Sequence, residues 1–149
     1  MSNRFTTAAA VRTFALGGNV LFTIVSGKTG TRFTYRVRVS VARDDGKPPK
    51  AGVFFVSLLS GPDNESDYQY LGIISKDDPM TFRLTAKSRA GEQAASVVAF
   101  RWFWGQVCQN RLPASLEVWH EGRCGRCGRT LTVPESIASG FGPECINHV

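Results

Sequence analysis

The sequence lacks several features that would assign a function directly. Only two of its 149 residues are histidine, His120 and His148, and both lie near the C-terminus, so no histidine-based catalytic arrangement is independent of that segment. It has no Gly-rich nucleotide-binding motif. No apolar run approaches the ~18–20 residues of a membrane-spanning helix. We therefore expect no enzymatic activity, no small-molecule substrate and no membrane partner.

The N-terminus also lacks a basic region followed by an apolar run and a cleavage site, so we expect no secretory signal and a cytoplasmic protein. The length suits about one domain of ~100–150 residues. Lysine and arginine exceed aspartate and glutamate by 18 to 12, for a net charge of +6. A basic excess weakly favours nucleic acid or an acidic surface as the partner.

Hydrophobic periodicity predicts an α+β fold, mostly an antiparallel sheet packed by one helix. Residues 32–41 alternate apolar and polar side chains, which is typical of a strand with one buried face, and 53–59 read as a buried central strand. Further strands are expected over 11–16, 20–26, 68–74, 81–85 and 116–119. Helical spacing favours one long helix at about 92–106. We divide the chain into a β-rich domain (1–115) and a small zinc-knuckle module (116–149).

The module carries the clearest chemical signal. Cys124 and Cys127 have the C-x-x-C spacing that presents two thiolates to one ion, and Gly128 suits the sharp turn of a zinc knuckle. Cys145 follows at the distance usual between the two halves of a small zinc site. Pro134 predicts a short helix between the two halves, because proline suits the first helical position. We expect one structural zinc ion.

Three thiolates require a fourth ligand for tetrahedral closure. We favour His120, which leads from an expected strand into the knuckle, over His148, which is one residue from a terminus that we expect to fray. Cys108 is the third choice, because its place at the end of the expected helix fits a buried apolar residue better.

The motif Cys-Gly-Arg-Cys-Gly-Arg over 124–129, followed by Leu131, Pro134, Gly-Phe-Gly-Pro over 140–143 and Cys145, resembles a zinc-binding domain of unknown function. That domain recurs in uncharacterised bacteriophage and bacterial proteins. The segments 29–37 and 61–68 resemble short phage and mobile-element proteins of the same architecture. The resemblance implies a phage or prophage origin and a zinc domain, with no established activity. Phe141 departs from the pattern, which has a smaller aliphatic residue there.

The basic charge is concentrated on one expected strand and its flanking loops. Residues 28–50 carry seven lysines or arginines against two aspartates, whereas 61–78 carry five acidic residues against one lysine. Arg32, Arg36 and Arg38 share one face of the strand, with side chains ~6.5–7 Å apart for neighbouring positions on that face. This arrangement favours nucleic acid, and a solvated face that keeps the protein soluble is the alternative. Three module arginines would extend it if the module folds beside the strand: Arg123, Arg126 and Arg129.

Four aromatic residues lie within five positions of the expected helix, which is more than one helical face can hold. Most are expected in the core, but an exposed Trp102 beside Arg101 would form an interaction patch. The leading hypothesis is a zinc-containing phage accessory protein that binds nucleic acid through the basic strand. The alternative is a protein–protein interaction module that binds or inhibits a host protein, such as a defence component.

Overall fold

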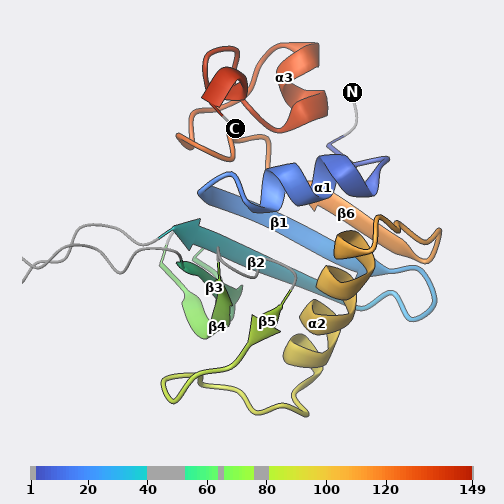
Figure 1. Ribbon diagram of the computed structural model, residues 1–149, viewed down its shortest axis with the longest axis vertical. Helices are drawn as coiled ribbons and strands as arrows, with labels where there is room; N and C mark the ends of the chain where they lie inside the picture. The colour runs from blue at the N-terminus through green and yellow to red at the C-terminus, as the bar shows by residue number, and fades with distance from the viewer. Residues whose placement is uncertain (1–2, 40–52, 64–65, 76–80, 149) are drawn as a thin grey trace, which may run out of the picture.

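The computed structural model describes residues 3–39, 53–63, 66–75 and 81–148. Six antiparallel strands form one sheet in the order β5-β4-β3-β2-β1-β6, which confirms the predicted α+β class (Figure 1). The elements are α1 (Ala8–Ala15), β1 (Asn19–Ser26), β2 (Arg32–Val39), β3 (Val53–Leu59), β4 (Tyr68–Ser75), β5 (Phe82–Arg83), α2 (Ala95–Cys108), β6 (Leu116–His120), α3 (Pro134–Ser139) and a 3₁₀ helix, η1 (Cys145–His148). None of the helices in the described residues has the length and hydropathy that a membrane-spanning helix requires.

The two faces of the sheet differ as the alternation in β2 predicts. Tyr35 and Val37 are fully buried on the inner face, whereas Arg32 and Arg38 are exposed on the outer face. β3, the expected central strand, pairs with β2 on one side and β4 on the other. The predicted loop at 44–50 and part of the acidic segment 61–78 lie outside the described residues.

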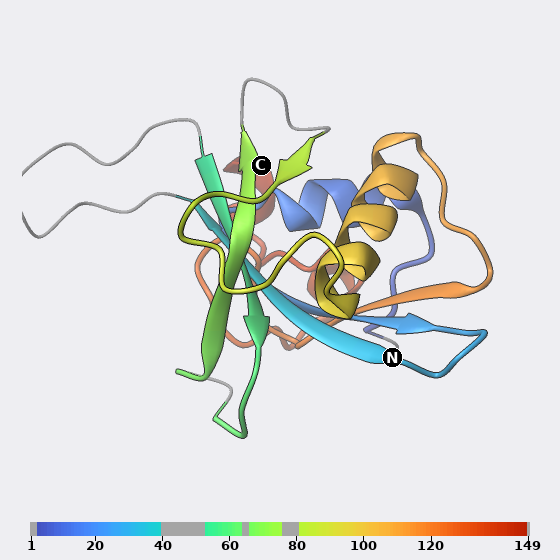
Figure 2. The same cartoon turned by 90° about the horizontal axis from the view of Figure 1, so that it is seen from below.

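Helices α1 and α2 lie on the same side of the twisted sheet (Figure 2). α2 packs Phe100 and Phe103 against Tyr35 and Phe22, with ring centroids 4.9 Å apart for Tyr35–Phe100 and 5.4 Å for Phe22–Phe103. The Tyr35 hydroxyl donates a hydrogen bond to the buried carbonyl oxygen of Ser96, at 2.7 Å. The inner face is therefore the core, and the helices leave the arginine face of β2 uncovered.

The expected strand at 11–16 is wrong, because residues 8–15 form α1. Three consecutive alanines favour a helix, and the Thr7 hydroxyl caps it by accepting a hydrogen bond from the backbone N–H of Ala10. Val11 and Phe14 are buried at helical spacing, which the β-branched character of Val11 obscured. The sheet is therefore packed by two helices, and the longer one begins and ends slightly later than expected, at Ala95–Cys108.

Strand β6 belongs to the sheet, since it pairs with β1 along its whole length. The boundary expected at 116 thus falls ahead of a sheet strand, and the part outside the sheet is 121–148. This part, called the module below, lies beside α1 at one end of the sheet (Figure 1). Phe141 of the module packs on Phe14 of α1 with ring centroids 5.7 Å apart. The module is therefore anchored to the core rather than tethered loosely.

Candidate metal centre and basic groove

Three thiol groups of the module converge on one point. The sulfur atoms of Cys124, Cys127 and Cys145 all lie within 4.8 Å of one another. Cys124 and Cys145 are buried and Cys127 is exposed, and none of them forms a disulfide. Three thiolates at this spacing form a donor set that suits a soft or borderline metal ion. The geometry thus confirms a cluster that can hold a metal.

The backbone around Cys124 forms a knuckle that stabilises a thiolate. The N–H groups of Arg126 and Gly142 donate to the Cys124 sulfur at 3.4 and 3.3 Å. The N–H of Gly128 donates to the Cys124 carbonyl at 2.9 Å, and Gly128 has a φ of 79°, where glycine is favoured. Hydrogen bonds from backbone N–H groups to a ligand orient it and stabilise its charge.

The two buried thiols differ in acidity. Burial raises the pKa of Cys124, but the backbone N–H groups of Cys127, Gly142 and Arg126 outweigh it together and lower the pKa to about 7. The guanidinium of Arg126 lowers the pKa of Cys145, yet burial and the neighbouring thiols raise it above its ordinary value overall. The surrounding N–H groups thus favour the thiolate form of Cys124. Neighbouring thiolates repel one another, so all three thiols ionise together only when a cation is present.

The short helix between the two halves of the site is confirmed. α3 begins at Pro134 and ends at Ser139, and Gly140, which has a φ of 81°, caps it. The carbonyl of Gly140 accepts a hydrogen bond of 2.8 Å from the backbone N–H of Gly125, next to Cys124. This contact ties the end of α3 to the knuckle, and the following turn then returns Cys145 to it.

His120, the favoured fourth ligand, does not join the cluster. It is buried, and its ring Nε2 lies 2.6 Å from the carbonyl oxygen of Ile137, so Nε2 carries the proton and donates. Its Nδ1 accepts a hydrogen bond of 3.0 Å from the backbone N–H of Gly122. Burial is the largest influence and lowers the pKa of His120, which favours this neutral form. A neutral imidazole has one lone pair for binding, and here Gly122 uses it.

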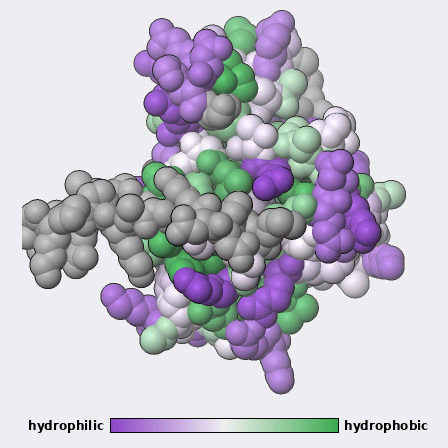
Figure 3. Space-filling model, viewed as in Figure 1, coloured by the Kyte–Doolittle hydropathy of each residue, from purple (hydrophilic) through white to green (hydrophobic). Residues whose placement is uncertain are grey.

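The alternatives His148 and Cys108 also stand apart from the three sulfurs. His148 is exposed in η1, and Cys108 ends α2. Among the described residues, the group of close metal-binding side chains contains only the three cysteines. The surface of the module carries several hydrophilic side chains in the view of Figure 3.

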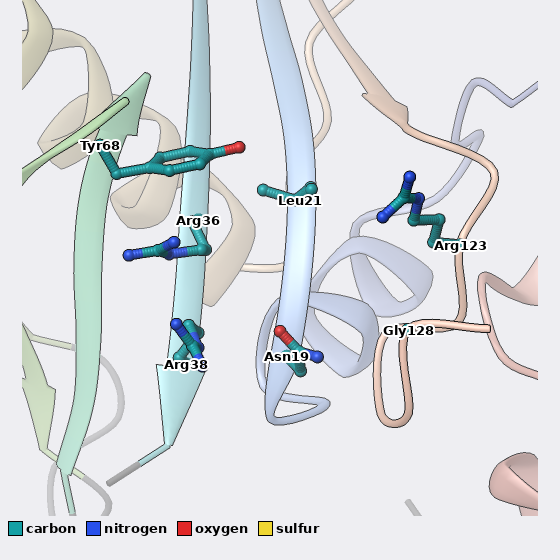
Figure 4. A pocket seen from close by; sticks show the side chains of 7 residues that line it. All are labelled: Asn19, Leu21, Arg36, Arg38, Tyr68, Arg123 and Gly128. Carbon is teal, nitrogen blue, oxygen red and sulfur yellow. The ribbon is translucent and has the colours of Figure 1, made fainter. Parts of the chain in front are cut away.

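A basic groove lies on the outer face of the sheet. It has a volume of about 310 Å³ and brings together Arg36 and Arg38 from β2 with Arg123 from the module. Figure 4 shows the two β2 arginines side by side and Arg123 across β1 from them, pointing toward Leu21. Burial first, and then the charge of Arg38, lower the pKa of Arg36. The groove therefore concentrates positive charge from segments far apart in the sequence.

The first residue of β1 explains how the module reaches the groove. Asn19 pairs with Arg38 of β2, and its backbone N–H donates to the carbonyl of Gly125 at 2.8 Å. β1 is thus hydrogen-bonded to β2 on one side and to the knuckle on the other. Arg123 follows β6, the other neighbour of β1, and so faces the same groove.

Sequence reasoning missed Tyr68 as a groove residue. Its ring lies under the guanidinium of Arg36, with the carbon of that group 4.2 Å from the ring centroid. Tyr68 lies on β4 and Arg36 on β2, and only β3 separates these two strands in the sheet. Its only sequence signal is its position at the start of an expected strand, which does not indicate a site.

The remaining predicted arginines divide between two other places. Arg126 and Arg129 line a second, larger hollow in the module, of about 970 Å³, which meets the basic groove at Gly128. Arg32 shares the outer face of β2 but lies at its other end, paired with Val25 of β1. The structure thus gathers three of the six arginines and places two more next to them.

Trp102 is exposed, as expected, but Arg101 does not line the same hollow. Trp102 is 44% exposed, and it lines an apolar hollow of about 470 Å³ together with Val98, which is 53% exposed. Arg101 pairs instead with Glu92 and lies over the ring of Phe82. The other three helix aromatics, Phe100, Phe103 and Trp104, are buried as expected.

Comparison with known proteins finds a match only for the C-terminal part of the chain. Residues 114–149 match the model of a family of unknown function (DUF6011). The match covers β6 and the module, including all three clustered cysteines. No curated protein and no solved structure matches the chain. The similarity therefore marks the module as a recurring unit and assigns it no activity.

Proposed function

We propose that this protein is a small zinc-containing accessory protein that binds nucleic acid through the basic groove. One observation carries the proposal: Arg36 and Arg38 of the sheet line the same groove as Arg123 of the module. The phage or prophage setting implied by the sequence resemblance is part of the proposal. It describes a binding protein rather than an enzyme.

The chemistry of the groove fits a nucleic-acid backbone. Arg36 and Arg38 lie two positions apart on one strand, so their guanidinium groups are placed to meet successive phosphates. Among the described residues, no carboxylate forms an ion pair with either of them. Tyr68 adds an aromatic ring next to Arg36, and rings beside arginines provide stacking for unpaired bases. This combination favours single-stranded over double-stranded nucleic acid.

Zinc is the ion that the three cysteines fit best. Thiolates select zinc among the common divalent ions, and the C-x-x-C knuckle with N–H groups directed at sulfur is typical of zinc sites. In this proposal the ion holds the turn that carries Arg123, because Arg123 is adjacent to Cys124. The metal therefore shapes one side of the groove.

The test is binding to labelled DNA and RNA oligonucleotides, single- and double-stranded, by fluorescence anisotropy at several salt concentrations. The test variant carries Arg36→Gln, Arg38→Gln and Arg123→Gln. Each phosphate contact contributes ~0.7–0.9 to the slope of log affinity against log salt, so we expect the slope to fall by about 2–3.

The matched control removes the same charge elsewhere, by changing to glutamine three exposed residues that do not line the groove: Arg12, Lys87 and Arg111. We expect the control to keep the wild-type slope. Equal loss in both variants would reduce the effect to net charge, and no binding of the wild-type protein at low salt would refute the proposal.

The apolar hollow at Trp102 favours a second candidate function, binding of a host protein. Exposed tryptophans in apolar surroundings are frequent anchors of protein interfaces. The immobilised wild-type chain should retain a host protein, and this retention should be insensitive to salt. Trp102→Ala should abolish it. Trp119→Ala is the control, because Trp119 lies on β6 and does not line this hollow. Equal retention by both variants would exclude this role for Trp102.

A further inference from the structure

The metal centre has three protein donors where a tetrahedral ion takes four. Cys124, Cys127 and Cys145 form a close group, and no other cysteine, histidine or carboxylate of the described residues belongs to it. His120 has both ring nitrogens engaged by backbone groups, at 2.6 and 3.0 Å. Moving His120 onto the ion would break both hydrogen bonds and withdraw a buried ring from its contacts with Phe5 and Phe14. His120 is therefore a structural residue.

The side of the cluster at Cys127 is open to solvent. Cys127 is exposed, and it lines the hollow of about 970 Å³ together with Cys145. Arg126 and Arg129 line the same hollow, and the Arg126 guanidinium reaches to 3.7 Å from the Cys145 sulfur. An ion held by the three sulfurs would thus face an open hollow whose charged lining residues are Arg126, Arg129 and Glu144, which together carry a net positive charge.

We propose that the module holds its metal through these three thiolates alone and that the fourth coordination position is taken by an exchangeable ligand, water or a small anion, from the hollow. Sites with three protein ligands and one open position are the arrangement in which zinc binds external molecules. A divalent ion and three thiolates together carry a net negative charge. Arg126 offsets this charge and makes an anionic fourth ligand possible. The inference rests on the proposed metal site and assigns it a ligand-binding role beyond holding the knuckle.

The experiment replaces zinc by cobalt in the full chain and records the visible absorption bands of the ion. Titration with azide, a small anion that binds metals, should produce a saturable shift of these bands at one equivalent of cobalt. Arg126→Gln should weaken azide binding about tenfold, the scale of one hydrogen bond to a charged group. Arg111→Gln is the matched control, since Arg111 is exposed and does not line the hollow, and should bind azide as the wild type does.

His148 provides the decisive alternative, because it follows Cys145 by three residues and is exposed. In our proposal His148→Ala leaves the cobalt spectrum and the azide response unchanged. X-ray absorption of the zinc-loaded protein should then show three sulfurs at ~2.3 Å, one light atom and no imidazole ring. An imidazole signal in the X-ray absorption spectrum would overturn the open position while leaving the metal site intact. So would cobalt bands that do not respond to azide but shift in His148→Ala. Failure to bind cobalt at all would overturn the metal site as well.

Discussion

Removal of the metal should unfold the module and leave the sheet folded. In residues 121–148 the only large apolar side chains that are fully or almost fully buried are Leu131 and Phe141. Burial of each contributes ~1.5–3 kcal/mol. A structural zinc ion contributes ~10–16 kcal/mol to small zinc-binding peptides at neutral pH. If the cluster holds zinc as proposed, the ion is the dominant source of stability in the module, whereas β2 and β3 contain none of the three cysteines.

Hydrogen exchange measured by mass spectrometry tests this difference directly. The backbone N–H groups of Gly125, Gly128 and Leu131 donate hydrogen bonds within the module. After complete chelation, or in Cys124→Ser, we expect these amides to exchange at nearly the rate of an unfolded chain. Amides of β2 and β3 should keep their protection. Unchanged protection of the module in protein verified to be metal-free would refute the reasoning, and simultaneous loss in β2 and β3 would show that the sheet also depends on the ion.

Two further predictions concern the core and the contact between module and α1. Burial raises the pKa of Tyr35, so stability is present below the ordinary tyrosine value of ~10 and is lost as the pH rises beyond it. Tyr35→Phe should lower the free energy of unfolding by ~1–3 kcal/mol at pH 7, because the buried Ser96 carbonyl loses the Tyr35 hydroxyl as a donor. It should also reduce the loss of stability at alkaline pH. Urea unfolding at pH 7 and above pH 10 measures both effects, and an unchanged alkaline loss would contradict the role of Tyr35. Gly140→Ala should cost ~1–3 kcal/mol in thermal or urea unfolding, because Gly140 has a φ of 81° and a Cβ there would collide with the Phe14 ring. Gly91→Ala, where a Cβ meets nothing within 4 Å, is the control, and equal effects would refute this explanation.

The strands of the sheet were predictable where the pattern of apolar residues reflects whether one or both faces of the strand are buried. The alternation of β2 and the apolar run of β3 each follow from the environment of the strand, so the pattern alone placed them. α1 was not predictable in the same way. The helix has only eight residues, and Val11 favours a strand locally. The helix also depends on the burial of Phe14 among groups contributed by the module. The alanines and the spacing of Val11 and Phe14 are local helix signals, but the groups that cover Phe14 come from elsewhere in the chain and cannot be read from residues 8–15.

The candidate site shows the same division between local and non-local information. Spacing sufficed for Cys124, Cys127 and Cys145, because the knuckle, α3 and the turn that returns Cys145 to it follow one another directly in the chain. Spacing failed for His120, since its ring is held by a carbonyl seventeen residues further along the chain, at Ile137. A histidine beside a C-x-x-C has the right chemistry for a ligand, but its lone pair is available only if the fold leaves it unused.

The groove depends on a junction that no short motif encodes. Asn19 begins β1, pairs with Arg38 and donates its backbone N–H to Gly125 of the knuckle. The knuckle then presents Arg123 toward the arginines of β2 across this one strand. If the ion stabilises the knuckle as argued above, metal loss will withdraw Arg123 while Arg36 and Arg38 stay in place on the folded sheet. Metal-free protein should then bind oligonucleotides with the reduced salt slope of Arg123→Gln rather than with the slope of the triple variant, because only the contribution from the module is removed.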